Sequence, residues 1–506
     1  MKTRHRTLLS AVALGTAALA GAAVRPATAP AEPSAPTTAV SVRSGASGEA
    51  VVQRPADAIR STAADRESVM ITVYNQNFGL VREVRDVAFT RGVAALEFSD
   101  VAEHIQPETV HLRAMNGGLA VLEQNYQYDL LDPQKLLEKY VGRMVKVWRW
   151  NGSTQRDEPV DAEVLSVNKG AILKIGDEIT YNYPGRFSFP EIPDNLIARP
   201  TLVWMLDSER PRHRLEVSYL TNNMNWKADY VFVIDDADAR GDLTGWVTLT
   251  NQSGASYENA RLKLVAGDVQ RMRQPRQVGI ALDEVVVTGA RAAPQFSEES
   301  FFEYHLYTLE RPATLLEREQ KQVTLLEADR IGLEKKMIFH GAAQYYRGQH
   351  GLIVSNKKVD VFLEFQNTRE NGLGIPLPKG MVRVYKADRA GAQQFIGEDN
   401  IDHTPRDERI RIRMGNAFDV VGDRRQMEYR ITGGRCEAES TWEVQLRNHK
   451  DEAVTVQVIE PIGGDWTILE SSHPHRTIDA HTFAFDLDMP ANRNDTIRYR
   501  VRVRWC

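Results

Sequence analysis

Strict alternation of apolar and polar side chains is the feature that most limits what this chain can fold into. Between residues 497 and 505, apolar side chains take the odd positions and arginines the even ones. Successive side chains of a β-strand point to opposite faces, so one face of this segment suits a core and the other suits water. Period-two stretches also occur at 246–250, 262–265, 359–365 and 442–446. Short strands at this spacing predict a mainly β protein with antiparallel β-sandwich domains of immunoglobulin-like type.

Smaller β units are expected before the sandwich region. Short strand-like runs separated by turn residues predict an N-terminal β domain over 66–125. A second group of runs predicts a small barrel-like unit over 126–200. This unit opens with a helical segment from Asp132 to Tyr140, where Asp132 can cap the helix and Pro133 suits its first position.

Residues 201–506 form the expected sandwich region. Glycines, prolines and charged residues interrupt its strand pattern near 271–300, which predicts a loop insertion there. At 506 residues the chain exceeds what one hydrophobic core usually serves, so several domains are expected.

The first residues have the pattern of a secretory signal peptide, here residues 1–22. Lys2, Arg4 and Arg6 precede an uncharged run from Leu8 to Val24, and small residues offer cleavage sites near Ala20 and Ala22. A membrane anchor is the alternative, but it needs about 20 strongly apolar residues, and this run is mostly Ala and Gly. We expect cleavage and a periplasmic or secreted protein, followed by a flexible Ala/Pro-rich tether over 23–65.

Charge and hydropathy exclude several classes of partner. The formal net charge is −5 and becomes −8 once the three basic residues of the signal are lost (−5 − 3). A mildly acidic exported protein offers no electrostatic basis for binding nucleic acid. No later segment is apolar enough to span a bilayer, so no transmembrane span is expected after processing. No cofactor motif is present, and none is predicted.

Several sequence blocks, in order, resemble those of a known bacterial family. They are Tyr219–Tyr230, Thr244–Trp246, Asn251–Gly254, Leu262–Gly267, Phe302–Leu309, Leu377–Gly380, Val382–Tyr385, Ile396–Asp399, Asp402–Pro405 and Gly415–Asp419. Together they are similar to the bacterial domain of unknown function 4139, over about residues 68 to 506. The resemblance implies an exported β-rich protein. It implies no activity and no catalytic or binding residues, because the family has none assigned.

The chain has two cysteines, Cys436 and Cys506. In an oxidising compartment they could pair, and closing a loop of this length would stabilise the fold by about 4 kcal/mol in the chain-entropy model. Pairing requires the two Cα atoms to lie within about 7 Å, so free thiols stay open as the alternative. No zinc ligands stand at the usual spacing from them.

A row of arginines in the final strand is the candidate binding surface. Arg498, Arg500, Arg502 and Arg504 should share one sheet face at about 6 to 7 Å spacing. Arginine pairs with phosphate and carboxylate, so an anionic glycan or a lipid head group is one interpretation. Alternatively, Glu443 and other acids on neighbouring strands neutralise the row.

Other polar clusters are interpreted as turns or hydrogen-bonding groups rather than metal sites. His473, His475 and His481 could bind a transition metal but stand in a Ser- and Pro-containing turn. The cluster of Asp235, Asp236, Asp238 and Asp242 suggests a calcium loop, but Arg240 takes a ligand position and no closing Glu follows. We predict hairpin turns and no metal.

His305 and His403 lie within family-like blocks, and we predict structural hydrogen bonds for both. The segment Asp283–Arg291 looks like the short box by which outer-membrane receptors bind TonB through strand addition. A coincidental strand is the alternative.

The sequence gives no catalytic residues. It contains no nucleophile elbow, no H-E-x-x-H helix and no local Cys-His signature. The leading hypothesis is therefore an exported, non-enzymatic binding or structural β module whose partner is an envelope component, namely a protein, a glycan or a lipid head group. The alternative is an envelope hydrolase acting on glycan or peptide, with a site assembled from distant residues.

Overall fold

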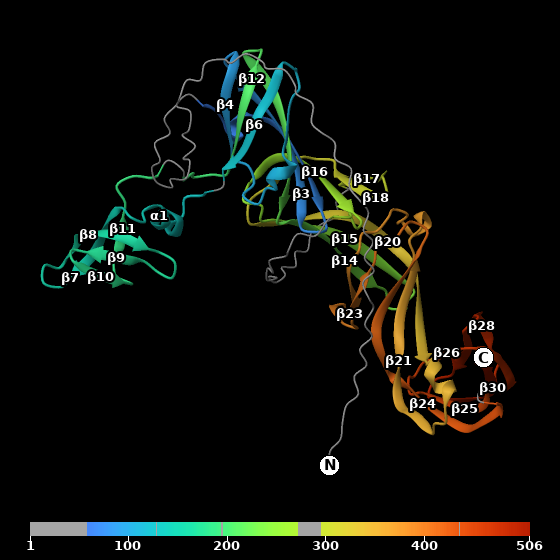
Figure 1. Cartoon of the computed structure of the whole chain (residues 1–506). Coiled ribbons are helices and arrows are strands. Elements are labelled where there is room, and N and C mark those ends of the chain that lie inside the picture. Colours follow the sequence, from blue (N-terminus) through green and yellow to red (C-terminus); the bar gives the residue numbers. More distant parts are fainter. Residues whose placement is uncertain (1–57, 128, 194–195, 272–294, 435) are drawn as a thin grey trace, which may run out of the picture. The chain divides into compact units, whose positions relative to one another are not determined.

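The computed structural model describes residues 58–127, 129–193, 196–271, 295–434 and 436–506 (Figure 1). The expected signal peptide, most of the expected tether and the TonB-box-like segment lie outside these residues. Within them the protein is mainly β, as the alternation predicts, and its strands form four sheets.

The first two sheets are built from residues 59–315 and pack on a common core. The four-stranded sheet has the order β1 (Ile59–Ser61), β4 (Gly92–Ser99), β12 (Thr201–Ser208), β6 (Leu119–Gln127). The eight-stranded sheet has the order β17 (Phe296–Phe301), β18 (Tyr304–Leu309), β16 (Tyr257–Ala266), β2 (Arg66–Tyr74), β3 (Phe78–Ala88), β13 (Arg212–Asn222), β5 (His111–Ala114), with β19 (Ala313–Leu315) also on β16. Their inner faces share one core, which includes Phe98, Trp204 and Val217.

The largest sheet has thirteen strands and serves two cores. Its order is β23 (Gln393–Ile401), β22 (Gly380–Ala387), β14 (Met224–Ile234), β15 (Arg240–Asn251), β20 (Glu319–His340), β21 (Leu352–Gln366), β24 (Arg409–Gly433), β25 (Glu437–Asn448), β30 (Asn494–Arg504), β27 (Asp465–Ser471), with β26 (Val454–Pro461), β28 (Arg476–Asp479) and β29 (Thr482–Met489) attached beside it. Val323 of β20 packs in the core of the N-terminal sheets, whereas Phe339 of the same strand packs in a second core with Trp442 and Tyr499. Long strands therefore continue from one core into the next.

A fourth sheet forms a separate unit with its own small core. Its order is β10 (Glu178–Tyr181), β9 (Ile172–Ile175), β8 (Arg156–Ser166), β7 (Met144–Asn151), β11 (Arg186–Ser188), and helix α1 (Pro133–Lys139) packs on it (Figure 1). Asp132 caps α1 as expected, because its Oδ1 accepts hydrogen bonds from the backbone N–H groups of Gln134 and Lys135. The sheet is open among the described residues, since β10 and β11 are its two edges. The expected barrel is therefore not formed.

This unit is inserted between two neighbouring strands. Gln127 at the end of β6 pairs with Thr201 at the start of β12. The chain therefore leaves the four-stranded sheet and returns to the same place after building residues 129–193. We call these residues the inserted unit.

Two expected boundaries differ from the structure. Strands β12, β13 and β16, from the expected sandwich region, pair with β4, β3 and β2 of the expected N-terminal domain, so the host fold has no boundary at residue 201. The expected tether also extends too far, because β1 and a 3-10 turn (Ala63–Asp65) belong to the folded part. Local patterns reveal strands, but the partner of each strand depends on contacts distant in sequence.

Parallel pairing is the other departure from the expected antiparallel sandwich. Four strand pairs among the described residues are parallel, namely β1–β4, β2–β16, β14–β22 and β20–β26. The members of each pair are far apart in the chain, as parallel neighbours must be, because a tight hairpin can join only antiparallel strands.

Candidate functional site

A groove beside helix α1 has a mostly apolar lining. The helix presents Leu136 and Leu137 toward β11, and Tyr140 ends it. The Tyr140 hydroxyl donates a hydrogen bond to the Glu191 carbonyl oxygen (2.7 Å), which fixes the segment after β11 against the helix. The Tyr140 ring lies 5.0 Å from that of Phe189. The two walls of the groove are thus held together by two hydrogen bonds between Tyr140 and Glu191 and by aromatic packing.

The groove has a volume of about 790 Å³, within the range of about 300–1,000 Å³ that small-molecule sites occupy. Its lining is mostly aliphatic and aromatic and comprises Leu131, Asp132, Pro133, Gln134, Leu136, Leu137, Phe187, Phe189 and Ile192. Ile192 is 58% exposed at its edge. Such a lining can take up an apolar group and gain about 25 cal/mol for each Å² of apolar surface removed from water.

The only titratable side chain in the groove lining is Asp132. Its Oδ1 is already engaged by two backbone N–H groups as the helix cap. General acid–base chemistry needs a positioned proton donor or acceptor within reach of the substrate. Among the described residues, the groove lining offers no second titratable group to share that work.

Exposed apolar side chains are concentrated in the inserted unit. Of the 21 large hydrophobic side chains that are exposed in the described residues, seven belong to residues 129–193, a small fraction of the chain. Trp150 (61% exposed) on β7 and Tyr181 (75%) on β10 lie on the sheet face opposite the small core. The exposed apolar residues of the inserted unit are thus more frequent than in the rest of the described chain.

The arginine row is occupied by cross-strand ion pairs. Arg498 pairs with Glu443 (2.7 Å), Arg500 with Glu470 (3.0 Å), Arg502 with Glu439 (2.6 Å) and Arg504 with Asp465 (3.0 Å). The acids come from β25 and β27, the two neighbours of β30. The second of the two interpretations, neutralisation by neighbouring acids, is the one that fits this geometry. An anionic ligand would have to displace a carboxylate from each arginine.

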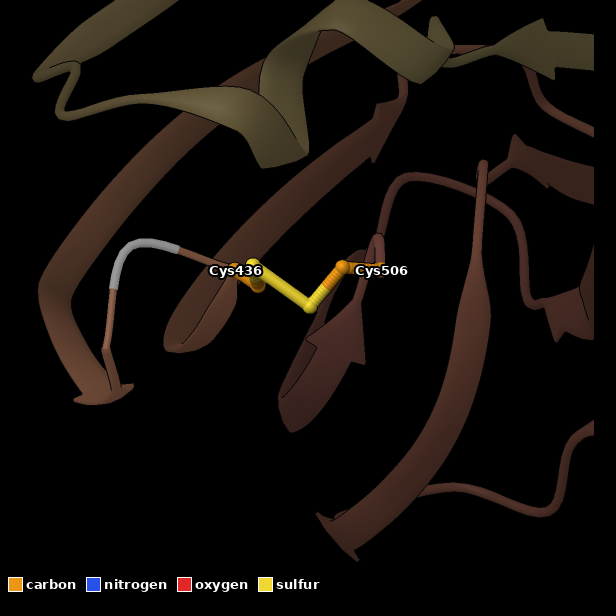
Figure 2. The surroundings of a disulfide bond; sticks show 2 residues. All are labelled: Cys436 and Cys506. Carbon is orange, nitrogen blue, oxygen red and sulfur yellow. A yellow bond between two sulfur atoms is a disulfide. The ribbon is translucent and has the colours of Figure 1, made fainter.

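Cys436 and Cys506 form a disulfide (Figure 2). Their Cα atoms are 5.6 Å apart, within the distance that pairing requires. Trp505 adds a backbone hydrogen bond to the Cys436 carbonyl oxygen (2.9 Å). The bond therefore ties the end of β30 to the start of β25, and its role is structural.

The histidines and aspartates of the two clusters contact other partners. His473 lies beside Asp495 (3.3 Å), whereas the His475 ring packs against Phe483 and Phe485. Asp235 accepts hydrogen bonds from Ala239 and Arg240 in a turn, and Asp238 pairs with Lys335 and Lys386. The described residues contain no group of three or more His, Cys, Asp or Glu side chains placed to hold a metal ion.

His305 and His403, 98 positions apart in sequence, interact electrostatically in the fold. His305 Nδ1 lies 2.8 Å from Glu298 of β17, and His403 Nδ1 accepts a hydrogen bond from the Lys379 backbone N–H (3.2 Å). Burial, followed by the positive charge of Lys379, lowers the pKa of His403 and favours its neutral form. The bonds of both imidazoles join separate chain segments, in agreement with structural hydrogen bonding.

Comparison with known proteins places the chain in a family. The model of a family described as a domain of unknown function, DUF4139, matches residues 215–506, more than half of the chain. The chain belongs to this family. The DUF4139 match begins inside β13 and covers the long shared sheet, the arginine row and the disulfide, whereas the inserted unit lies before it. No curated protein matches the chain.

The DUF4139 match assigns no activity. The groove is therefore a candidate site on the basis of its geometry alone. Among the residues that the structure describes, none of the helices is long and apolar enough to cross a membrane. Sequence reasoning missed the groove residues. The only local signal was a short helix followed by a Phe-Ser-Phe stretch at 187–189, which is also what an ordinary core segment looks like.

Proposed function

We propose that this protein is an exported envelope protein that acts as a non-enzymatic binding module, taking an apolar group of its partner into the groove beside α1. The groove carries this proposal, because it is large, apolar and edged by an exposed Ile192. The partner is an envelope component. The export signal at the N-terminus, inferred from sequence, supports the location.

The inserted position of the unit supports a binding role. Its two ends meet at the Gln127–Thr201 pair, so changes within the unit leave the pairing of β6 with β12 in place. Binding residues often lie on segments that connect the strands of a rigid scaffold. An envelope hydrolase, the alternative expectation, would need further acid or base groups beside Asp132, and the groove lining does not supply them.

The groove is tested by placing a charge at its edge. Ile192→Glu puts a carboxylate against an apolar ligand, and because Ile192 is largely exposed, the fold should persist. We expect crosslinking pull-downs from envelope fractions to recover the partner with at least about tenfold lower yield, equivalent to about 1.4 kcal/mol.

Two matched controls accompany this variant. Ile431→Glu, at a 59% exposed position of β24, should not change the yield. Ile179→Glu changes the outer face of the inserted unit instead of the groove. Its yield therefore shows which of the two surfaces binds the partner. Equal recovery by wild type and Ile192→Glu would refute the groove as the binding site.

Export is tested separately. We expect N-terminal sequencing of the protein from the producing cell to begin after Ala20 or Ala22 in an envelope fraction. The intact chain in the cytosol, with Met1 or Lys2 at its start, would contradict both the location and the choice of partners.

A further inference from the structure

A buried charge cluster in the N-terminal core contains more positive than negative charge. Glu83 of β3 accepts hydrogen bonds from Arg66 Nε (2.6 Å) and from Arg85 Nη2 (3.1 Å). The side chains of Glu83 and Arg85 are fully buried, and that of Arg66 is 10% exposed. One carboxylate thus serves two guanidinium groups, which leaves an excess of one positive charge. A buried charge without a partner is strongly unfavourable.

Arg85 is the fully buried arginine of this cluster. Its Nη1 donates a hydrogen bond to the Ser61 carbonyl oxygen (3.1 Å), and its guanidinium carbon lies 3.5 Å from the centre of the Phe98 ring. Its Nε has no hydrogen-bond partner among the described residues. Nothing can reach Arg85 from solvent, so any added anion has to meet the excess charge through Arg66.

Arg66 lines a second cavity, of about 840 Å³. The cavity is formed where the start of β2 meets the turn after β4, the chain returning from the inserted unit, and the turn before β16. Among the described residues, Nε is the Arg66 nitrogen that has a hydrogen bond. A guanidinium carries five N–H groups, so the Nη edge of Arg66 is available to a carboxylate in a paired geometry.

Four carboxylates and a second arginine, Arg199, also line the cavity, among uncharged residues. Glu67 pairs with Arg214, and Asp100 pairs with Arg199. Glu103 and Glu258 also line the cavity, are exposed, and have no ion pair within the described part of the chain. The cavity therefore has a positive group on its buried side and negative groups at its exposed side.

We propose that this cavity binds a short zwitterionic peptide, whose C-terminal carboxylate meets Arg66 and whose N-terminal ammonium meets Glu103 and Glu258. The unpaired carboxylates of Glu103 and Glu258 disfavour a polyanion in the same place. The volume is in the upper part of the range of about 300–1,000 Å³ for small-ligand sites, more than one amino acid requires. This site is separate from the groove beside α1 and does not depend on the function proposed for it.

The proposal is tested with tetra-alanine and the full-length mature protein, using calorimetry at low ionic strength. Four peptides are compared, namely free, N-acetylated, C-amidated and blocked at both ends. We expect amidation to weaken binding by at least about tenfold, since it removes the charge-assisted pair with Arg66, and acetylation to weaken it less. Added salt should weaken the free peptide most.

Variants locate the site. Glu103→Gln combined with Glu258→Gln should reproduce the effect of acetylation, whereas Glu310→Gln combined with Glu428→Gln, at exposed positions outside the cavity, should change nothing. Arg66→Lys keeps the charge beside Glu83 but loses the paired geometry, so it should reproduce amidation. Equal binding of the free and doubly blocked peptides overturns the proposal. So does the absence of binding by all four at millimolar concentration.

Discussion

Two regions of the protein bury an arginine with a glutamate, and they differ in how the charges balance. In the C-terminal core, Arg424 pairs with Glu460, and the Tyr346 hydroxyl donates to Glu460 Oε2 (2.9 Å). Tyr499 completes the group at 2.8 Å from Tyr346. This cluster has one acid and one base. The N-terminal cluster has one acid, Glu83, for two bases.

The surroundings of Arg424 and Arg66 also differ. Arg424 is enclosed by the rings of Phe339 and Tyr345, and it donates a hydrogen bond to the His340 carbonyl oxygen (3.0 Å). Arg66, in contrast, lines a cavity. In the balanced and enclosed cluster each charge has a partner of opposite sign, although Arg424 Nε, like Arg85 Nε, has no hydrogen-bond partner among the described residues. An unbalanced cluster beside a cavity is completed by a ligand. Charge count and access together separate the two clusters.

The largest effects are expected from removing each carboxylate charge. Glu460→Gln leaves Arg424 buried without its anion and should lower the free energy of unfolding by about 3–5 kcal/mol. Glu83→Gln leaves two guanidinium groups close together and should cost more than Glu460→Gln. Denaturant unfolding followed by tryptophan fluorescence measures both. A smaller loss in Glu83→Gln would contradict the unequal balance of the two clusters.

A smaller change in stability is expected when the pH is lowered, because of His340 in the C-terminal region. Burial, and then the nearby positive charges of Lys357, Arg411 and Arg424, lower the pKa of His340 below its ordinary 6.5, despite the opposing effect of Asp360. The unfolded chain therefore takes up a proton first as the pH falls below about 6.5, so stability decreases there and is unaffected above it.

His340→Gln should remove this part of the acid sensitivity, measured as the change in thermal midpoint between neutral pH and the acid side of 6.5. His481→Gln, at an exposed turn, serves as the control. An unchanged pH dependence in His340→Gln would show that its imidazole is equally easy to protonate in both states.

The smallest effect is expected on the surface. Arg498→Ala removes an ion pair with Glu443 whose arginine is 70% exposed, and solvent screens such pairs. We expect a loss of no more than about 1 kcal/mol, and a double-mutant cycle with Glu443→Ala measures the coupling directly. A coupling free energy as large as that of the buried clusters would show that the arginine row contributes substantially to stability.

Some of the fold could be predicted because its signal is local. The alternation at 497–505 predicted β30, with Ile497, Tyr499 and Val501 buried as expected. Asp132 and Pro133 predicted the start of α1, because capping depends on residues within one turn. The family resemblance, built from short blocks, agrees with the DUF4139 match over 215–506.

Strand pairing and both cavities could not be predicted in the same way. Nothing in residues 66–74 indicates that β2 pairs with β16, because that pairing is decided by the packing of the whole core. Arg66, Glu83 and Arg85 appear in the sequence as ordinary charges of two strands. The burial of Arg85 depends on segments distant in sequence, since it contacts the Ser61 carbonyl oxygen and the Phe98 ring.

The pairing of β2 with β16 also has a consequence for how the protein is made. β2 spans Arg66–Tyr74, and its parallel partner β16 spans Tyr257–Ala266. A nascent chain grows at about 5–20 residues per second. β16 is therefore synthesised many seconds after β2, and one edge of β2 stays unpaired during that time. During that interval, unpaired apolar strands are exposed to aggregation. The strands made before β16 therefore lack this neighbour until residue 266 has been synthesised.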